Sequence, residues 1–210
     1  MPPAKRAAPM SPEERRASIV AAAIPVLRNH GRDATTAQIA MAAGVAEGTL
    51  FRVFPDKEAL ICAAIASAFD PAPTERELAA IDHEQPLRVK LIAAVEVLQR
   101  RIGSVWQLIT VLALPQAGKP ETPPPSSNEQ GRVPMHDAGI VAKLEALFAP
   151  HRAELCCEPA LATRLLRSLT LASTHPRLTE GPPLTAGEVV SVLLDGLRAR
   201  PDEDLEAEVG

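Results

Sequence analysis

Apolar residues recur at intervals of three or four along most of the 210-residue sequence. This is the spacing of side chains on one face of an α-helix. Examples are Ile19, Ala23, Val26 and Leu27 near the start, and Leu87, Leu91, Val95 and Leu98 further on. Hydrophobic residues make up 46% of the chain, 36 of them are Ala, and aromatic residues reach only 2%. Because such a composition favours helices over sheets, we predict an all-α protein.

Helix-ending and helix-starting residues divide the chain into parts. Ser11-Pro12 has the pattern of a helix start, and Gly31 has that of a helix end. Gly103 predicts a break between two helices, and six prolines predict a mobile loop over 115–134. The predicted parts are a flexible arm (1–10), a first helical domain (11–70) that ends near Pro71 and Pro73, a larger helical domain (71–200) and an acidic tail (201–210).

The net charge of −4 is unevenly distributed. Residues 1–57 carry eight Lys or Arg and five Asp or Glu, a net charge of +3, whereas residues 58–210 have a net charge of −7. A polyanionic partner is therefore expected to bind the first quarter of the chain. The longest uncharged run, residues 102–118, contains polar residues and a proline, so no membrane span is predicted.

Residues 35–69 hold the most informative pattern. Two short helical segments, from Thr35 or Thr36 to about Ala43 and from about Glu47 to Val53, lie on either side of Gly44-Val45. A further helix is predicted over 57–69. Two short helices joined by a tight glycine turn are typical of a helix-turn-helix. The alternative is a plain helical bundle in which the glycine turn is incidental.

The run TTAQIAMAAGVAEGTLFRVFPDKEALI (residues 35–61) resembles the DNA-binding domain of TetR-type transcriptional regulators. The matching residues are Thr35 or Thr36, Ile39-Ala40, Ala43-Gly44-Val45, Gly48-Thr49-Leu50, Phe54, Lys57-Glu58 and Leu60. The resemblance implies an N-terminal three-helix DNA-binding domain followed by a larger helical domain for ligand binding and dimerisation. It implies a homodimer that binds a palindromic double-stranded DNA operator.

The resemblance also implies roles for individual residues. The set expected to contact DNA is Thr36, Gln38, Ala46, Glu47, Gly48, Thr49, Phe51, Arg52 and Lys57. Within this set, Gly48, Thr49, Thr36 and Lys57 would hold phosphates. Glu47, Arg52 and Gln38 would reach base edges, since Arg can bind guanine and Glu can accept from cytosine. Phe51 stands where the family usually has Tyr, so a phenolic phosphate contact is missing.

Two leucine- and valine-rich stripes in the second domain could form the dimer interface that the resemblance implies. Their residues are Leu161, Leu165, Leu169, Val190, Leu193, Leu194 and Leu197. The alternative is that both stripes face the core of their own domain.

A ligand pocket is implied among the middle helices. Its candidate lining residues are Phe69, Leu98, Ile102, Trp106, Ile109, Met135 and Phe148. A mostly aliphatic lining would suit a small apolar effector, although an apolar stripe is more often plain core.

We find no nucleotide-binding loop, metalloprotease motif, nucleophile elbow or convincing acid pair, so no enzyme activity is predicted. No cofactor or metal site is expected, because His151 beside Cys156-Cys157 lacks a second ligand cluster. Three cysteines and no export signal favour a cytoplasmic protein. The function predicted is a DNA-binding regulator, expected to be a repressor released by an effector. The alternative is a DNA-binding regulator or architectural protein without an effector.

Overall fold

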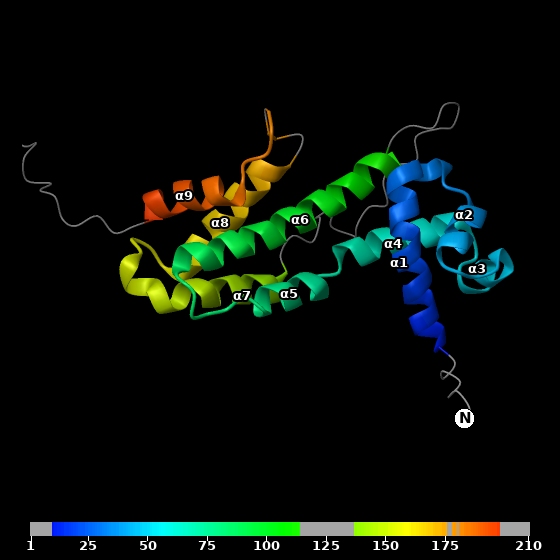
Figure 1. The fold of residues 1–210 in the computed structure, drawn as a ribbon, viewed down its shortest axis with the longest axis horizontal. Coiled ribbons are helices and arrows are strands. Elements are labelled where there is room, and N and C mark those ends of the chain that lie inside the picture. Colours follow the sequence, from blue (N-terminus) through cyan, green and yellow to red (C-terminus); the bar gives the residue numbers. More distant parts are fainter. Residues whose placement is uncertain (1–9, 114–136, 176–177, 180, 198–210) are drawn as a thin grey trace, which may run out of the picture. The chain divides into compact units, whose positions relative to one another are not determined.

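The structure is a computed structural model, and it describes residues 10–113, 137–175, 178–179 and 181–197. Every regular element in these ranges is helical, which confirms the predicted fold class. The α-helices are α1 (Pro12–His30), α2 (Thr36–Ala42), α3 (Glu47–Val53), α4 (Lys57–Phe69), α5 (Ala72–Ala79), α6 (Leu87–Ala113), α7 (Ala138–Phe148), α8 (Pro159–Thr174) and α9 (Ala186–Leu197) (Figure 1). Two 3₁₀ helices, η1 (Gly31–Asp33) and η2 (Ala149–Glu154), complete the described elements.

The chain forms two compact units. The first contains α1 to α4 together with the described end of α6 from Val105, and the second contains the rest of α6 with α5, α7, η2, α8 and α9. The predicted first domain did not include any part of α6. The end of α6 joins the first unit because Leu108 and Leu112 are buried in its apolar core.

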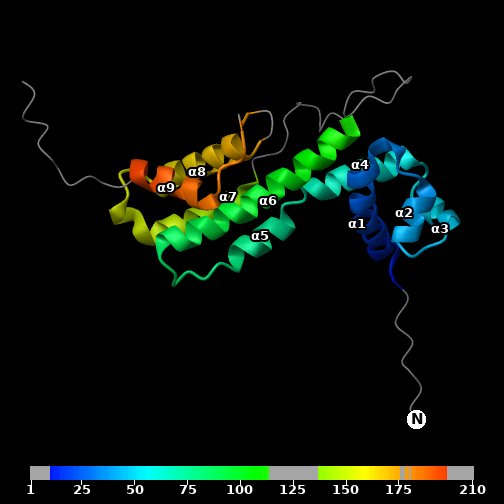
Figure 2. The same cartoon turned by 45° about the horizontal axis from the view of Figure 1, so that its top comes forward.

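In the first unit, α1 packs against α2 and α4, and α2 packs against α3 (Figure 2). The start of α1 is capped on both sides: the backbone N–H of Glu14 donates to the Ser11 hydroxyl over 3.1 Å, and the Glu14 carboxylate accepts from the Ser11 N–H over 2.7 Å. These bonds lower the pKa of Glu14. Gly31 ends the helix with a positive φ of 56°, which glycine adopts without strain.

The predicted break at Gly103 is wrong, because α6 runs without interruption from Leu87 to Ala113. A glycine inside a helix costs about 1 kcal/mol relative to Ala. Burial of apolar residues on both sides of it, such as Leu98 before and Leu108 after, outweighs that cost. Periodicity alone therefore located the helix but not its continuity.

Pro71 and Pro73 follow the end of α4, as predicted, but they have a second role. They begin a helix, α5. A proline is tolerated in the first turn of a helix because its missing N–H would have no partner there. The Asp70 carboxylate accepts a bond from the Ala72 N–H over 3.0 Å and helps to start α5.

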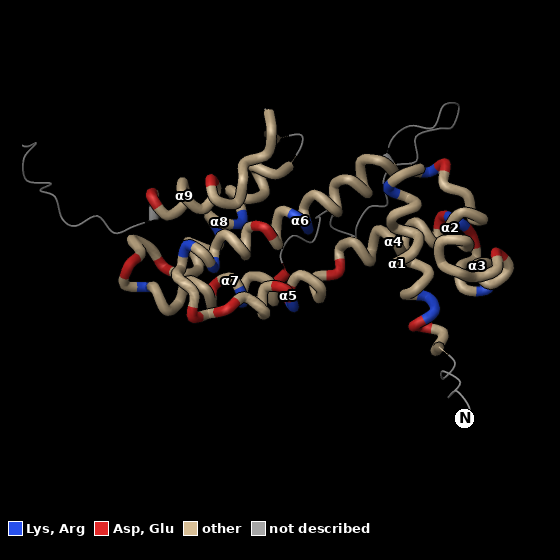
Figure 3. The backbone as a smooth tube through the Cα atoms, in the orientation of Figure 1, with Lys and Arg blue, Asp and Glu red and all other residues tan. Residues whose placement is uncertain are grey.

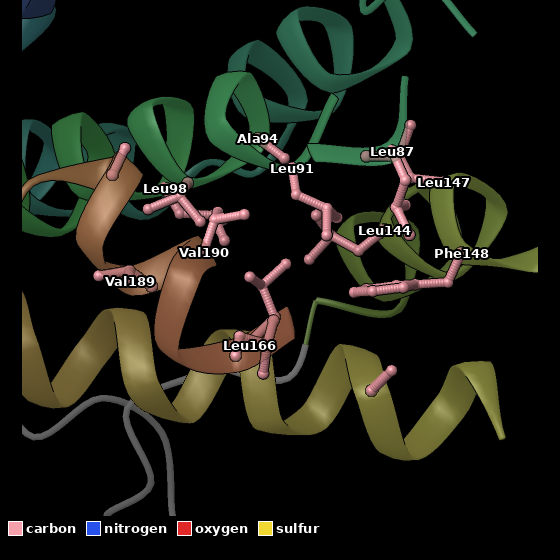
Figure 4. Packing of buried hydrophobic residues seen from close by; sticks show 14 of the residues in the cluster. Leu87, Leu91, Ala94, Leu98, Leu144, Leu147, Phe148, Leu166, Val189 and Val190 are labelled. Carbon is pink, nitrogen blue, oxygen red and sulfur yellow. The ribbon is translucent and has the colours of Figure 1, made fainter. Parts of the chain in front are cut away.

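The second unit has its own apolar core, to which α5, α6, α7, α8 and α9 all contribute. Figure 4 shows Leu91 and Leu98 of α6 pointing toward Leu144, Leu166 and Val190 of the facing helices. α8 packs against both α7 and α9, and α5 packs against α7.

Two ionic groups lie at the edge of this core. Arg101 donates to the Asp137 carboxylate over 2.8 Å and to the Asp70 carbonyl over 2.7 Å. Lys90 is only 1% exposed, and its ammonium donates to the His83 carbonyl and to His151 Nε2, each over 3.1 Å. These bonds offset the cost of removing a charge from water.

Candidate nucleic-acid interface

The predicted helix-turn-helix is present, and its apolar residues hold it together. Ile39 of α2 and Leu50 of α3 are fully buried, as is Phe54 directly after α3. Gly44 makes the turn with a φ of 65°, and the Val45 N–H donates to the Ala40 carbonyl over 3.0 Å. This packing leaves one side of each short helix to solvent.

Gln38 has a structural role at the start of α2. The Thr35 hydroxyl accepts from the Gln38 N–H over 3.1 Å, and the Gln38 side-chain oxygen accepts from the Thr35 N–H over 2.8 Å. This reciprocal cap satisfies two backbone donors at the helix start. The amide oxygen of Gln38 is thereby engaged within the protein, which weakens its candidacy as a base-reading group.

The solvent side of α3 carries most of the residues predicted to contact DNA. Glu47, Gly48, Phe51 and Arg52 are exposed, as is Ala46 just before the helix, while Thr49 is half-buried. Phe51 is 47% exposed, which is unusual for a large aromatic side chain. The helix therefore presents one aromatic ring and one guanidinium side by side in sequence.

Met41 of α2 was not among the predicted residues, although it is 79% exposed. Ala37 lies four residues before Met41 and is also exposed, so the two share one face of α2. The burial of Ile39 and Ala40 implies this orientation, and helical spacing could have indicated it.

Glu47 and Thr36 join the two helices. The Thr36 hydroxyl donates to the Glu47 carboxylate, which links the first residue of α2 to the first residue of α3. Both residues were predicted to contact DNA separately. The structure brings them together, so the Glu47 carboxylate has a partner within the protein.

Lys57 begins α4, and its ammonium donates to the backbone carbonyl of Arg32 in η1. The Asp56 carboxylate accepts from the Ala59 N–H over 2.7 Å and caps the same helix. Lys57 is half-buried, and its ammonium is held against η1 by the bond to Arg32.

Arg16 of α1 is a second residue that the sequence did not single out. Its guanidinium lies 4.3 Å from the centre of the Phe54 ring, and Nη1 donates to the Val53 carbonyl over 3.4 Å. It therefore ties α1 to the end of α3. Helical spacing gives no signal for such a contact, because it joins residues 37 positions apart.

Figure 3 shows basic and acidic positions interspersed around α1, α2 and α3. Two cations lie near each other in sequence here, Arg52 in the last turn of α3 and Lys57 at the start of α4. Arg52 is exposed, whereas Lys57 is half-buried and hydrogen-bonded to the backbone. Arg52 is therefore the better placed of the two to reach a base edge.

Residues 19–64 match the sequence model of the family described as bacterial regulatory proteins, tetR family. These residues span α1 from Ile19 onward, the helix-turn-helix and the first part of α4. Residues 19–64 are a TetR-family DNA-binding domain. We therefore assign α2 and α3 as the DNA-binding helix-turn-helix of a TetR-type regulator.

Solved structures extend this likeness beyond the helix-turn-helix. A TetR transcriptional regulator from Streptomyces coelicolor is 25% identical, with a TM-score of 0.51, 89% of this chain covered and 99% of that chain. The fatty acid degradation regulator FadR from Bacillus halodurans is 20% identical, with a TM-score of 0.51 and coverage of 87% and 99%. FadR from Bacillus subtilis, in complex with stearoyl-CoA, is 18% identical, with a TM-score of 0.51 and coverage of 85% and 95%. No curated protein sequence matches the chain.

The predicted dimer residues separate into two groups. Leu161 and Leu165 of α8 are 36% and 39% exposed, and Leu169 is half-buried. In contrast, Val190, Leu193 and Leu194 of α9 are buried in the core of their own unit, so this stripe is not available to a partner. The face of α9 that reaches solvent carries Val192 instead, which is 61% exposed. The side chain of Leu197 lies outside the described residues.

The predicted pocket residues are also placed differently from one another. Leu98 and Phe148 are buried in the apolar core of the second unit. Phe69, Ile102, Trp106 and Ile109 are half-buried, and Met135 lies outside the described residues, as does the predicted 115–134 loop. Burial of Leu98 and Phe148 in the core agrees with the plain-core alternative for these two residues.

Cys156 is exposed and Cys157 is half-buried, between η2 and α8. Burial, together with the neighbouring Cys156, raises the pKa of the Cys157 thiol. No group of three or more metal-binding side chains occurs in the described ranges. Within the same ranges, no helix has both the length and the apolar composition needed to cross a bilayer.

Proposed function

We propose that this chain is a sequence-specific TetR-type repressor that binds a palindromic operator as a homodimer and is released by a small apolar effector. The observation that carries the proposal is the exposed side of α3. Phe51 and Arg52 lie on this side, whereas Leu50 is fully buried on the opposite side. A helix held rigidly from behind can present its outer side chains to a major groove.

The residues divide by chemistry in this proposal. Arg52 reads a guanine through its forked guanidinium, and Phe51 with Ala46 packs against thymine methyl groups. Gly48, Thr49 and Lys57 hold the phosphate backbone. Thr36 and Glu47 fix the two short helices to one another and do not read bases.

A homodimer follows from the need to occupy two half-sites about 34 Å apart. Leu161, Leu165 and Val192 support it, because large exposed apolar side chains on adjacent helices suit a subunit interface. The effector has weaker support: the FadR structure from Bacillus subtilis is a complex with stearoyl-CoA, so a protein with this fold can bind an acyl ligand.

Selection of bound duplexes from a random DNA pool tests the proposal. A consensus with two-fold symmetry, and half-sites one helical turn or a multiple of it apart, is expected. Absence of any enriched sequence, with no binding of duplex DNA at low salt, would contradict it.

A regulator without an effector is the second candidate, and the burial of Leu98 and Phe148 in the apolar core favours it. Titration of the DNA complex with free fatty acids of increasing chain length, and with stearoyl-CoA, separates the two. Release of the operator by one of these compounds supports the effector. Retention of the complex, together with an unchanged unfolding temperature, supports a regulator that does not respond to this class.

A further inference from the structure

Arg32 of η1 is bonded in three directions within the first unit. Its Nε donates to the backbone carbonyl of Leu112 at the end of α6 over 2.9 Å. Its Nη1 donates to both carboxylate oxygens of Glu58 in α4, over 2.8 and 2.9 Å. Its own backbone carbonyl accepts from the Lys57 ammonium. One residue thus connects the end of α6 to the first two residues of α4.

The end of α6 packs tightly against η1 beside Arg32. A Cβ built on Gly31 would lie 3.0 Å from both the Cγ1 atom and the carbonyl oxygen of Val111. Leu108 and Leu112 are buried in the same apolar core as α1 and α4. The Leu112 carbonyl is therefore held firmly, and it is a fixed anchor for the Arg32 guanidinium.

We propose that Arg32 is a positioning residue for DNA binding: anchored by Leu112 and Glu58, it fixes the carbonyl that holds the Lys57 ammonium at the start of α4. The inference rests on the proposed function, in which Lys57 contacts a phosphate. An ammonium has three donors, so the bond to Arg32 leaves two for a phosphate oxygen. A lysine side chain loses much rotamer freedom when it is ordered. Because Lys57 is already ordered by its bond to Arg32, that entropy cost is not part of the free energy of DNA binding.

Two other roles for Arg32 make different predictions. If its guanidinium contacted a phosphate itself, its loss would weaken binding independently of Lys57. The Arg32 side chain is only 20% exposed and its guanidinium is ion-paired with Glu58, which argues against this role. If Arg32 only stabilised the fold, its loss would lower the unfolding temperature without a specific dependence on Lys57.

A double-mutant cycle tests the proposal. Arg32→Gln, Lys57→Ala and the double variant are compared with the unaltered protein on the selected duplex and on a scrambled duplex, at several salt concentrations. We expect Arg32→Gln alone to weaken binding about 2- to 10-fold, the range for loss of a hydrogen bond. In the Lys57→Ala background the same change should have no further effect.

The salt dependence gives an independent readout. Lys57→Ala should reduce the slope of log affinity against log salt by about 0.9 for each phosphate that the protein no longer neutralises. Arg32→Gln should reduce it in the same direction, and the double variant should match Lys57→Ala. Reductions of affinity that multiply in the double variant would overturn the proposal and assign Arg32 a phosphate contact of its own.

Controls separate folding from positioning. Arg76→Gln removes an exposed arginine of α5 in the second unit, and it should leave binding unchanged. If Arg32→Gln proves too unstable to assay, Glu58→Gln replaces it, because it removes only the ion pair. Glu58→Gln removes a negative charge, so electrostatics alone would increase the affinity for DNA. We expect no increase while Lys57 is present, because the loss of the ion pair also loosens Arg32 and the carbonyl that holds Lys57. A gain of affinity there would overturn the proposal. Failure of the unaltered protein to bind any duplex would instead refute the proposed function.

Discussion

The hydroxyl of Thr36 donates to the carboxylate of Glu47, and this bond joins the first residues of the two helices of the helix-turn-helix. An acid facing a polyanion would weaken DNA binding if it remained free. Here it fixes α3 against α2, so its contribution is to the geometry of the site.

Glu47→Ala is expected to strengthen binding to scrambled DNA, because one negative charge per subunit is removed near the phosphates. On the selected duplex the gain should be smaller, because the bond that fixes α3 against α2 is also lost. The selected consensus should not change. Parallel titrations of the selected duplex and a scrambled duplex measure both effects. A change in the consensus selected by the variant would show that Glu47 reads a base.

Arg52→Ala should weaken binding to the selected duplex by about 1–3 kcal/mol, the worth of a good bidentate base contact. Binding to scrambled DNA should fall much less. Fluorescence anisotropy on both duplexes at fixed salt checks the ratio. Arg76→Ala is the matched control, since it removes an exposed arginine in the second unit. Equal decreases on both duplexes would remove Arg52 from the base-reading residues.

Gly31→Ala should destabilise the protein by about 1–3 kcal/mol. The residue has a φ of 56°, which an alanine adopts with strain, and its Cβ would press on the backbone of Val111. Chemical denaturation measures the free energy of unfolding.

Gly103→Ala is the control for that experiment. Gly103 lies inside α6, and nothing stands within 4 Å of a Cβ built there. This change should stabilise the protein by about 0.5–1 kcal/mol, through the higher helix propensity of alanine. Destabilisation by Gly103→Ala would mean that the continuous helix is not the stable form.

Leu165→Asp combined with Val192→Asp should weaken the dimer at least tenfold without lowering the unfolding temperature of the subunit. Both side chains are exposed in the subunit, so a charge there is harmful only at an interface. Sedimentation analysis measures the dissociation constant. Val89→Asp, at a 48% exposed valine of α6, should have no effect on assembly. An equal response from Val89→Asp would place the interface elsewhere.

A pH dependence is expected at the start of α9. The Glu188 carboxylate accepts from the Thr185 N–H and hydroxyl, each over 2.8 Å, and these bonds lower the pKa of Glu188 from 4.5. A group with a lowered pKa stabilises the fold above its unfolded pKa, and this stabilisation is lost as the pH falls through the folded value. Glu188→Gln should therefore lower the unfolding temperature at pH 7. Thermal unfolding at stepwise lower pH should show the difference shrinking once the pH is below about 4. A constant difference across this range would mean that the charge is not responsible.

Much of the first unit could be predicted from short-range signals. Ser11, Pro12 and Gly31 predicted the ends of α1, and the bounds of α3 and α4 agree with the predicted helices. These signals are strong because capping and proline effects act within one or two turns of a helix.

The second unit was less predictable, as α9 illustrates. Val190, Leu193 and Leu194 form a stripe that suits a subunit interface or an internal core equally well. The structure places that stripe inside and leaves Val192 outside. Spacing defines an apolar face, but the partner of that face depends on how the other helices pack.

The amino-acid sequence by itself determined the all-helical fold and the helix-turn-helix, because helix spacing, caps and the glycine turn are local properties. Only the tertiary structure decided that Glu47 pairs with Thr36, that Lys57 is held by the Arg32 carbonyl, and that α6 continues through Gly103 to reach η1. These outcomes depend on contacts between residues far apart in the chain. Their free energy comes from burial and hydrogen bonding in three dimensions, which no local pattern encodes.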